Sequence, residues 1–250
     1  MRRFHPRNTK AVFFDMNNTL IDPKVSFDAC FLHVLVDFAG RWDDGDGRWN
    51  PDNVLTTYKS EWKKEAPRLR GKPQLAEKAK QKCMEVALRH YPFQVNETFV
   101  SAFFREMRHQ MRDRAVLYPQ ALETVGGLAG TYKVGVITNG SREHLERVLA
   151  RVKLDDYIAG DRLFASDKSG IRKPNPAMFK AAARTVGVRP GEAVMVGDSW
   201  KNDISGAVKA GMNAVWLNRA GAGVKTGVRA GSTDVSVVSG FKELRELFET

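Results

Sequence analysis

Short apolar runs recur along the chain and predict the strands of a sheet. They lie at residues 11–14, 134–137, 194–196 and 214–217, with a further edge strand expected at 234–238. The first run contains no polar residue, as expected for a strand that is covered on both faces. Because helical patterns separate the runs, the sequence predicts an α/β fold with a Rossmann-like, doubly wound parallel sheet.

Two of the helices between these strands are predicted by their spacing and their ends. Apolar residues at positions 145, 148, 149 and 152 follow the repeat of one buried helix face. Further along, Asn175 followed by Pro176 predicts the start of a helix, and Gly187 predicts its end. Both segments therefore fit the crossover helices of a parallel sheet.

The segment between the first two predicted strands has a different pattern. It lacks a clear buried strand, and it contains long charged helical patterns. We therefore expect an all-helical domain, 22–117, inserted into a core domain formed by 1–21 and 118–250. Three tryptophans of this segment are expected to lie in its hydrophobic core rather than to form a stacking platform: Trp42, Trp49 and Trp62.

Composition narrows the class of protein. The 250 residues contain no run of 18 or more apolar residues, so no membrane span is expected. The apolar stretch after the basic start is too short for a secretory leader. Two cysteines, Cys30 and Cys83, suggest neither a disulfide framework nor a zinc site. A reducing, cytoplasmic location is the simplest expectation.

The net charge of +11 and the pI of about 9.7 allow two interpretations. The surface could attract polyanions such as nucleic acid, or it could be a solvated basic surface suited to small anionic substrates. No nucleic-acid-binding motif accompanies the charge, so nucleic acid is the less favoured partner. A smaller basic segment allows two interpretations as well. It could bind a second anionic group of the substrate, or it could be a solvated helix face; it consists of Lys63, Lys64 and the stretch 68–72.

Polar residues that could form one site follow the predicted strands. In chain order they are Asp15 and Asn17, then Thr138 and Asn139, then Lys173, and finally Asp198 and Asp203. Parallel sheets place their ligands at the carboxyl ends of the strands, so these residues are expected at one edge. The set suits phosphoryl transfer, because a carboxylate can attack phosphorus and Mg²⁺ prefers hard oxygen ligands. A hydroxyl and an ammonium group can hold the remaining phosphate oxygens.

These segments resemble, in order, the four motifs of the haloacid dehalogenase (HAD) superfamily. The resembling segments are Phe13-Phe14-Asp15-Met16-Asn17-Asn18-Thr19-Leu20, Val136-Ile137-Thr138-Asn139-Gly140, Lys173-Pro174-Asn175-Pro176, and Val196-Gly197-Asp198-Ser199 with Asn202-Asp203. The resemblance covers roughly 10–21 and 118–240. The inserted helical segment is similar in position to the α-helical cap of many members, which usually selects the substrate and excludes water.

The resemblance implies a Mg²⁺-dependent phosphatase that acts on a small phosphorylated metabolite through an aspartyl-phosphate. Asp15 would be the nucleophile and a metal ligand, together with the backbone carbonyl of Asn17 and the carboxylate of Asp198. Asp203 would be a further ligand or would orient one. The transferred phosphoryl group would be bound by Thr138 and Lys173, with Asn139 beside them, and Lys173 would also shield the repulsion between the carboxylates.

Asn17 departs from the family pattern. Phosphatases of the family usually carry an aspartate two residues after the nucleophile, which protonates the leaving oxygen and then activates water. An amide does not exchange a proton in this way, and losing such help typically costs about 10²–10⁴-fold in rate. Asn17 and Asn18 could also shape the turn after the strand, since asparagine tolerates left-handed geometry. The two roles are compatible.

Four interpretations of Asn17 remain open. The protein could be a slow phosphatase, or one with another proton carrier, for which Asp22 and His33 are candidates by proximity in the sequence. It could act on phosphates with a good leaving group, such as acyl or enol phosphates. It could be a dehalogenase, although members of that kind lack the metal and have Ser-Ser-Asn in the fourth motif. It could bind phosphorylated ligands without turnover, although the retained Asp15 favours chemistry.

Overall fold

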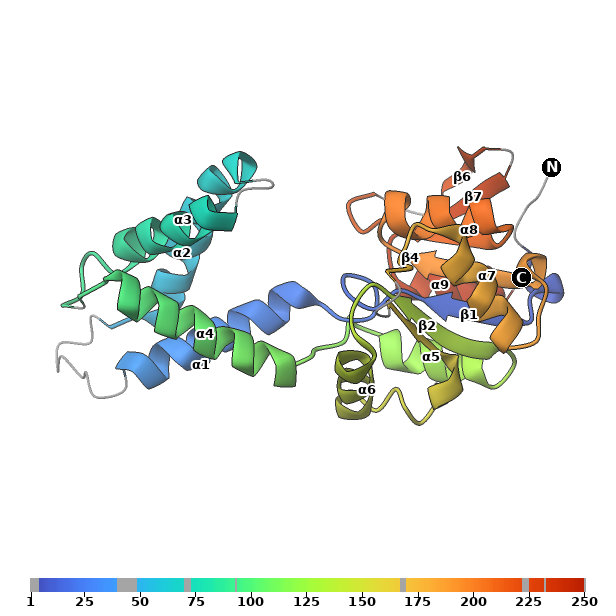
Figure 1. Ribbon diagram of the computed structural model, residues 1–250, viewed down its shortest axis with the longest axis horizontal. Helices are drawn as coiled ribbons and strands as arrows, with labels where there is room; N and C mark the ends of the chain where they lie inside the picture. The colour runs from blue at the N-terminus through green and yellow to red at the C-terminus, as the bar shows by residue number, and fades with distance from the viewer. Residues whose placement is uncertain are drawn as a thin grey trace. The chain divides into compact units, whose positions relative to one another are not determined.

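The computed structural model describes residues 5–39, 49–69, 73–92, 94–166, 170–221, 225–231 and 233–249. The chain divides into two compact units (Figure 1). The core unit comprises Met1–Pro23 and Ala115–Thr250, and the inserted unit comprises Lys24–Arg114. Trp42 and part of the basic stretch 68–72 lie outside the described residues.

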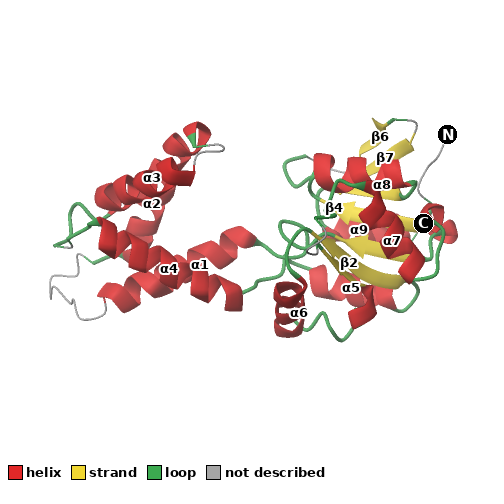
Figure 2. Cartoon of the chain, viewed as in Figure 1, coloured by secondary structure: helices red, strands yellow, loops and turns green. Residues whose placement is uncertain are grey.

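Seven strands form one sheet in the described part of the core unit (Figure 2). They are β1 (Ala11–Phe14), β2 (Lys133–Thr138), β3 (Leu163–Ala165), β4 (Ala193–Gly197), β5 (Asn213–Leu217), β6 (Lys225–Ala230) and β7 (Thr233–Val238). Their order in the sheet is β3-β2-β1-β4-β5-β7-β6. Every neighbouring pair is parallel except β6 with β7. The chain runs to opposite sides of β1 to make β2 and β4, which is the switch in direction that opens a ligand crevice.

The five predicted runs all lie within observed strands, but the prediction that 234–238 forms the edge was wrong. The edge on that side is β6, which pairs antiparallel with β7. Its sequence, Lys-Thr-Gly-Val-Arg-Ala, has no continuous apolar run and so gave no strand signal. The opposite edge, β3, has three residues and was also not predicted.

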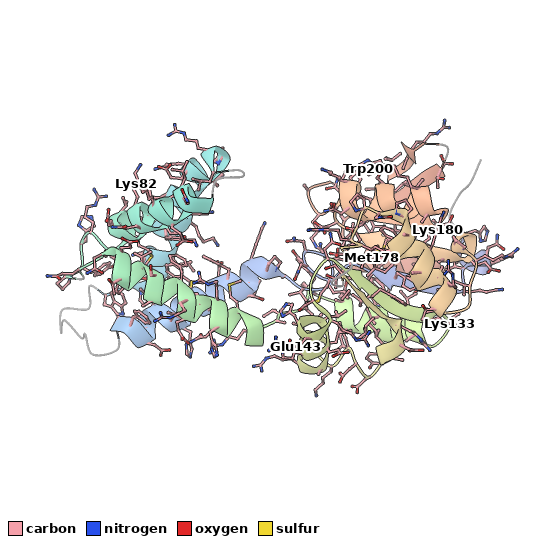
Figure 3. All side chains as sticks on the ribbon, viewed as in Figure 1. Lys82, Lys133, Glu143, Met178, Lys180 and Trp200 are labelled. Carbon is pink, nitrogen blue, oxygen red and sulfur yellow. The ribbon has the colours of Figure 1, made fainter. Side chains whose placement is uncertain are left out.

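Helices cover both faces of the sheet, as a doubly wound fold requires. One face is packed by α5 (Ala121–Ala129), α6 (Arg142–Arg151) and α9 (Phe241–Phe248), against Val12 and Phe14 of β1. The other face is packed by α7 (Pro176–Thr185) and α8 (Ser205–Ala210), against Ala11 and Phe13. The side chain of Met178, labelled in Figure 3, belongs to this second layer. Residues one apart on β1 therefore enter different cores, which explains its unbroken apolar run.

The predicted ends of α7 are observed. The side chain of Asn175 accepts a hydrogen bond from the backbone N–H of Ala177 at 3.0 Å, and Pro176 occupies the first turn. Gly187 follows the helix with a φ of +69°, a conformation that glycine adopts without steric cost. These caps fix the helix that begins directly after Lys173 and Pro174.

The inserted unit is helical throughout its regular structure in the described residues. It contains α1 (Pro23–Ala39), α2 (Pro51–Glu65), α3 (Pro73–Ala87) and α4 (Glu97–Asp113). Its core is aromatic, with the ring centroids of Phe31 and Phe103 5.0 Å apart. Trp49 and Trp62 are partly buried against this core, as expected. At the surface, Lys82 on α3 forms an ion pair with Glu65 of α2 at 2.7 Å (Figure 3 labels Lys82).

Short helical turns complete the core and inserted units. They are the 3₁₀ turns Pro6–Asn8, Ala66–Arg68, Gly160–Arg162 and Pro190–Glu192, and a π-helical turn at Trp200–Ile204. Among the described residues, no helix has both the length and the apolar character needed to cross a membrane.

Candidate active site

A polar pocket of about 480 Å³ lies where β1, β2 and β4 end. The seven residues that the sequence singles out all line it: Asp15, Asn17, Thr138, Asn139, Lys173, Asp198 and Asp203. They come from four separate segments of the chain, and the sheet brings them together because its parallel strands point their carboxyl ends toward this edge.

Three carboxylates form the most acidic part of the pocket. Asp15, Asp198 and Asp203 each offer an oxygen, and these oxygens lie within 4.8 Å of one another. Burial is the main factor that raises the pKa of both Asp198 and Asp203 above the ordinary value, and the charge of Asp15 adds to it. Like charges held this close need a cation, and an all-oxygen set is what Mg²⁺ prefers.

Lys173 is one cation that meets this need. Its Nζ donates to Oδ1 of Asp15 at 2.5 Å and to Oδ1 of Asp203 at 2.6 Å, and its side chain is only 3% exposed. The nearby ammonium acts against the burial effect and lowers the pKa of Asp203. A buried charge is tolerated when it is paired and hydrogen-bonded, so the lysine and the two carboxylates stabilise one another.

Asn139 holds the backbone of Lys173. Its Oδ1 accepts from the backbone N–H of Lys173 at 2.8 Å, and its Nδ2 donates to the backbone carbonyl of Lys173 at 3.1 Å. Both ends of the amide are therefore engaged, so its observed contacts position the lysine. Next to it, the hydroxyl of Thr138 is buried at the end of β2 and accepts from the backbone N–H of Gly140 at 3.2 Å.

The loop after β1 carries the nucleophile candidate and turns sharply. Asn18 has a φ of +59°, in the left-handed region that asparagine tolerates, as the sequence suggested for this turn. The turn is closed by backbone hydrogen bonds from Ile21 to Met16 and from Asn18 to Ile21, both at 2.9 Å. Asn17 lines the pocket from this loop.

Contacts from two residues with no assigned role in the sequence fix Asp198. The buried hydroxyl of Thr19 accepts from the backbone N–H of Asp198 at 3.1 Å and lies 3.4 Å from its Oδ1. On the other side, Nε1 of Trp216 donates to the backbone carbonyl of Asp198 at 2.9 Å. Only the position of Thr19 within the first motif hinted at its importance, and Trp216 gave no signal beyond its place in a strand.

Gly197 leaves space for Asp203. A Cβ at residue 197 would lie 2.5 Å from Oδ2 of Asp203, which is closer than real contacts allow. The same Oδ2 accepts from the backbone N–H of Ser199 at 3.0 Å. The glycine of the Gly-Asp-Ser segment is therefore needed for the close approach of the buried carboxylate to the end of β4.

The two proton carriers suggested by proximity in the sequence, Asp22 and His33, belong to different units. Asp22 belongs to the core unit but is not among the described residues that line the pocket. His33 lies on α1 of the inserted unit, and its Nδ1 is 3.0 Å from Oδ2 of Asp37.

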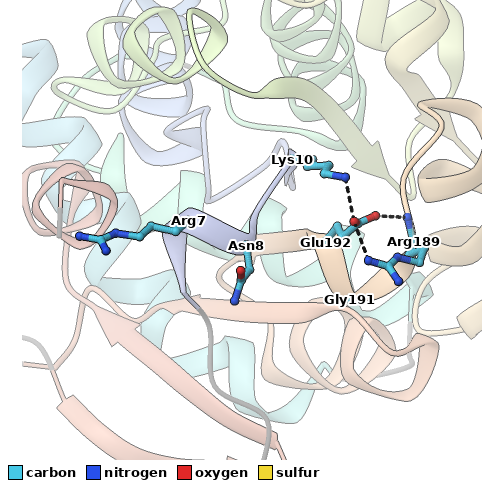
Figure 4. A pocket seen from close by; sticks show the side chains of 6 residues that line it. All are labelled: Arg7, Asn8, Lys10, Arg189, Gly191 and Glu192. Atoms are coloured by element: carbon cyan, nitrogen blue, oxygen red, sulfur yellow. Dashed lines mark hydrogen bonds and ion pairs between the residues drawn. The ribbon is translucent and has the colours of Figure 1, made fainter.

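A second polar pocket of about 460 Å³ lies at the amino-terminal ends of the strands, beside the start of β1 (Figure 4). Basic side chains line it, but the carboxylate of Glu192 forms ion pairs with two of them. Its Oε1 lies 2.9 Å from Nζ of Lys10 and 2.9 Å from Nη2 of Arg189. This arrangement joins the N-terminal segment to the turn before β4, and we read it as a structural clamp.

The chain is similar to known proteins in both sequence and structure. A family profile described as "haloacid dehalogenase-like hydrolase" matches residues 9–211. A curated relative, the glyceraldehyde 3-phosphate phosphatase of Pyrococcus furiosus, is 40% identical over 86 residues, which are 34% of this chain and 35% of the relative. The chain aligns with about a third to a half of the length of the first curated relatives that it matches.

Solved structures share the fold over nearly the whole chain. The 2-haloacid dehalogenase from Pseudomonas syringae pv. Tomato DC3000 is 24% identical, with a TM-score of 0.54, covering 96% of this chain and 98% of the other. The putative HAD-hydrolase YfnB from Bacillus subtilis, in a structure bound to magnesium, is 17% identical, with a TM-score of 0.60, covering 97% and 99%. At these identities the likeness concerns the fold.

Proposed function

The chain belongs to the haloacid dehalogenase-like hydrolase family, and on that basis we propose that it is a Mg²⁺-dependent phosphatase of a small phosphorylated metabolite. Asp15 is the proposed nucleophile. The observation that carries the proposal is the buried cluster of Asp15, Lys173 and Asp203, with the Asp198 carboxylate beside it. Such a cluster presents a nucleophile, a phosphate-binding cation and metal ligands at one point.

The donor set fits Mg²⁺. Asp15 and Asp198 would hold the ion with the backbone carbonyl of Asn17, and Asp203 would be a further ligand or would orient one. The three carboxylates supply closely spaced hard oxygens, and no nitrogen or sulfur ligand is needed. When bound, Mg²⁺ would offset the repulsion between a carboxylate nucleophile and a phosphate dianion.

The side chains of the chain itself would carry out the transfer. An Oδ atom of Asp15 attacks phosphorus, and the bond from phosphorus to the leaving oxygen breaks. The ammonium of Lys173 and the hydroxyl of Thr138 bind oxygens of the phosphoryl group as it moves. Asn139 keeps Lys173 in position through its two backbone hydrogen bonds. A water molecule then attacks the phosphorus and releases phosphate from Asp15.

Support for a phosphate substrate comes from the relatives as well as from the pocket. The relative from Pyrococcus furiosus is named as a phosphatase of glyceraldehyde 3-phosphate. A dehalogenase is less well supported, because Lys173 and three carboxylates make a site suited to a dianion and a cation. We also propose that the inserted helical unit acts as the cap that selects the substrate.

The test is Mg²⁺-dependent hydrolysis of p-nitrophenyl phosphate by the wild type, Asp15→Asn and Asn17→Asp. This ester has a good leaving group, so it makes little demand on an acid at residue 17. We expect turnover by the wild type, none by Asp15→Asn, and at least equal turnover by Asn17→Asp. A folded wild type that is inert with Mg²⁺ would contradict the proposal. If Asn17→Asp then gained activity, the natural protein would be better described as a binder of phosphorylated ligands.

A further inference from the structure

The pocket contains few groups that can move a proton. Among the described residues that line it, four side chains are ionisable: Asp15, Lys173, Asp198 and Asp203. The others that reach it are amides, hydroxyls or backbone. This inventory bears on the substrate, because the bond that breaks leaves electrons on an oxygen that must be either protonated or stable as an anion.

Each of the four ionisable groups is already engaged. Asp203 accepts on both carboxylate oxygens, from Nζ of Lys173 at 2.6 Å and from the backbone N–H of Ser199 at 3.0 Å. Asp15 accepts from Lys173 and is the proposed nucleophile. Asp198 lies against the hydroxyl of Thr19 and completes the carboxylate cluster. All three carboxylates are thus already held by hydrogen bonds within the cluster or from the residues that surround it.

Asn17 lines the pocket from the turn that follows the nucleophile, and it is exposed there. Its side-chain amide can donate a hydrogen bond to an oxygen, but it cannot give up a proton at neutral pH. Such an amide can stabilise a leaving oxygen by a hydrogen bond but cannot protonate it. It therefore suits a leaving group whose oxygen departs as an anion and stays anionic.

On these grounds we propose that the substrate is an acyl phosphate, a mixed anhydride of a carboxylic acid and phosphoric acid. The inference rests on the proposed function and names the substrate class of the same site. A carboxylic acid has a pKa of about 4, whereas a phenol has a pKa of about 10 and an alcohol a still higher one. A carboxylate therefore leaves as a stable anion.

The proton balance of the two steps agrees with this class. In the first step an oxygen of Asp15 bonds to phosphorus, and the electron pair of the broken P–O bond leaves on the carboxylate. In the second step water bonds to phosphorus, and the P–O bond to Asp15 breaks, returning its electron pair to the aspartate. Both protons of the water stay with the product, as dihydrogen phosphate. An alkyl phosphate would instead require one proton to reach the alkoxide.

The experiment compares two substrates that differ in their leaving group. kcat/KM is measured with Mg²⁺ for acetyl phosphate and for phosphoserine, an alkyl ester, using the wild type and Asn17→Asp. Because kcat/KM reports steps up to the transfer onto Asp15, it isolates departure of the leaving group. The ratio of variant to wild type for each substrate cancels differences in substrate binding. Asn18→Asp adds the same charge one residue along and is the matched control, while Asp15→Asn gives the background of spontaneous hydrolysis.

We expect Asn17→Asp to raise kcat/KM for phosphoserine by about 10²–10⁴-fold, the usual worth of general acid help. For acetyl phosphate the same variant should change kcat/KM by less than about tenfold, since no proton is needed. Asn18→Asp should not reproduce the gain on phosphoserine.

Two different failures can be told apart. If the wild type turns over both substrates with Mg²⁺ and Asn17→Asp gives no selective gain on phosphoserine, a proton reaches the leaving group from elsewhere, and the acyl phosphate inference is overturned while the phosphatase stands. If neither substrate nor p-nitrophenyl phosphate is hydrolysed above the Asp15→Asn background, the proposed function itself fails.

Discussion

The guanidinium of Arg219 lies behind the loop that follows β1. Its Nη2 donates to the backbone carbonyl of Thr19 at 2.8 Å, and its Nη1 donates to that of Asn18. The guanidinium carbon stands 3.4 Å from the centroid of the Tyr118 ring. Two carbonyls and a ring face are thus satisfied by one planar group, which a lysine cannot replace.

Arg219→Lys should lower kcat/KM for p-nitrophenyl phosphate by about 10–100-fold, because small displacements of reacting groups have effects of this size. One of the two backbone carbonyls of the loop would lose the hydrogen bond that it accepts from Arg219. Arg184→Lys, the same change at an exposed site on α7, is the control and should have no effect. The melting temperature is followed in parallel. An Arg219→Lys protein with full activity would show that the contact is dispensable.

Thr19→Val should destabilise the core unit by about 1–3 kcal/mol, the cost of leaving a buried donor without a partner. Valine keeps the shape of the side chain but cannot accept from the backbone N–H of Asp198. Urea unfolding measures the difference in stability between Thr19→Val and the wild type. Mg²⁺-dependent activity is a second readout, in which Thr19→Ser, which keeps the hydroxyl, should lie closer to the wild type than Thr19→Val does. Equal stability of Thr19→Val and the wild type would refute the role given to this hydrogen bond.

At the level of elements, apolar runs predicted the buried strands and failed at the edges of the sheet. β1 and β4 are buried at every position, so each is a continuous apolar run that can be recognised without knowing which strand pairs with it. β6 depends on pairing with β7, and β3 is three residues long, so neither has a run of its own. The site followed from the same logic, because the candidate residues lie at the ends of strands or close to the starts of helices.

Contacts between distant segments were beyond prediction from one sequence. Asn139 and Lys173 are 34 residues apart, and Arg219 is 201 residues from Asn18. Nothing in a local pattern links such pairs, because they meet only through the order of the strands. The two hydrogen bonds between the side chain of Asn139 and the backbone of Lys173 are contacts of this kind, which no local pattern indicated.

The inserted unit depends on its aromatic core. Phe31 is fully buried and contacts the rings of Tyr58 and Phe103, with centroids 5.1 Å and 5.0 Å away. Phe31→Ala should cost about 3–5 kcal/mol in the unfolding free energy of this unit, through lost burial and a cavity. Phe38, on the same helix, is 38% exposed, so Phe38→Ala is the matched control and should cost less. Denaturant unfolding followed by tryptophan fluorescence measures both, and equal losses would contradict this account of the core.

On the scale of the whole molecule, the two ends of the parallel strands differ in the residues that they carry. The carboxyl edge gathers the reactive side chains, and the amino edge is held by the Glu192 clamp. Hydrogen bonds from Arg189 and Lys10 lower the pKa of Glu192 from its ordinary value of 4.5 to about 2. Because the folded state favours the ionised carboxylate, the clamp stabilises the protein above about pH 4.5 and loses its effect as the pH falls toward 2.

Glu192→Gln should therefore destabilise the protein at pH 7, and the difference from the wild type should shrink at pH 3. Urea unfolding at the two pH values measures it. Glu143→Gln, at an exposed position on α6, serves as the control (Figure 3 labels Glu143). A difference that stays the same at both pH values would mean that the charge of Glu192 is not what the clamp uses.

The central claim is that Asp15 becomes phosphorylated. Asn17 offers no base to speed the attack of water, so the aspartyl-phosphate should persist long enough to be trapped. The wild type, Asp15→Asn and Asp155→Asn, an exposed control, are mixed with Mg²⁺ and acetyl phosphate, quenched in acid and analysed by mass spectrometry.

The account predicts one added phosphoryl group per chain, located on Asp15, in the wild type and in Asp155→Asn, and none in Asp15→Asn or without Mg²⁺. Turnover of substrate by the wild type without any phosphorylated Asp15, together with turnover by Asp15→Asn, would contradict it.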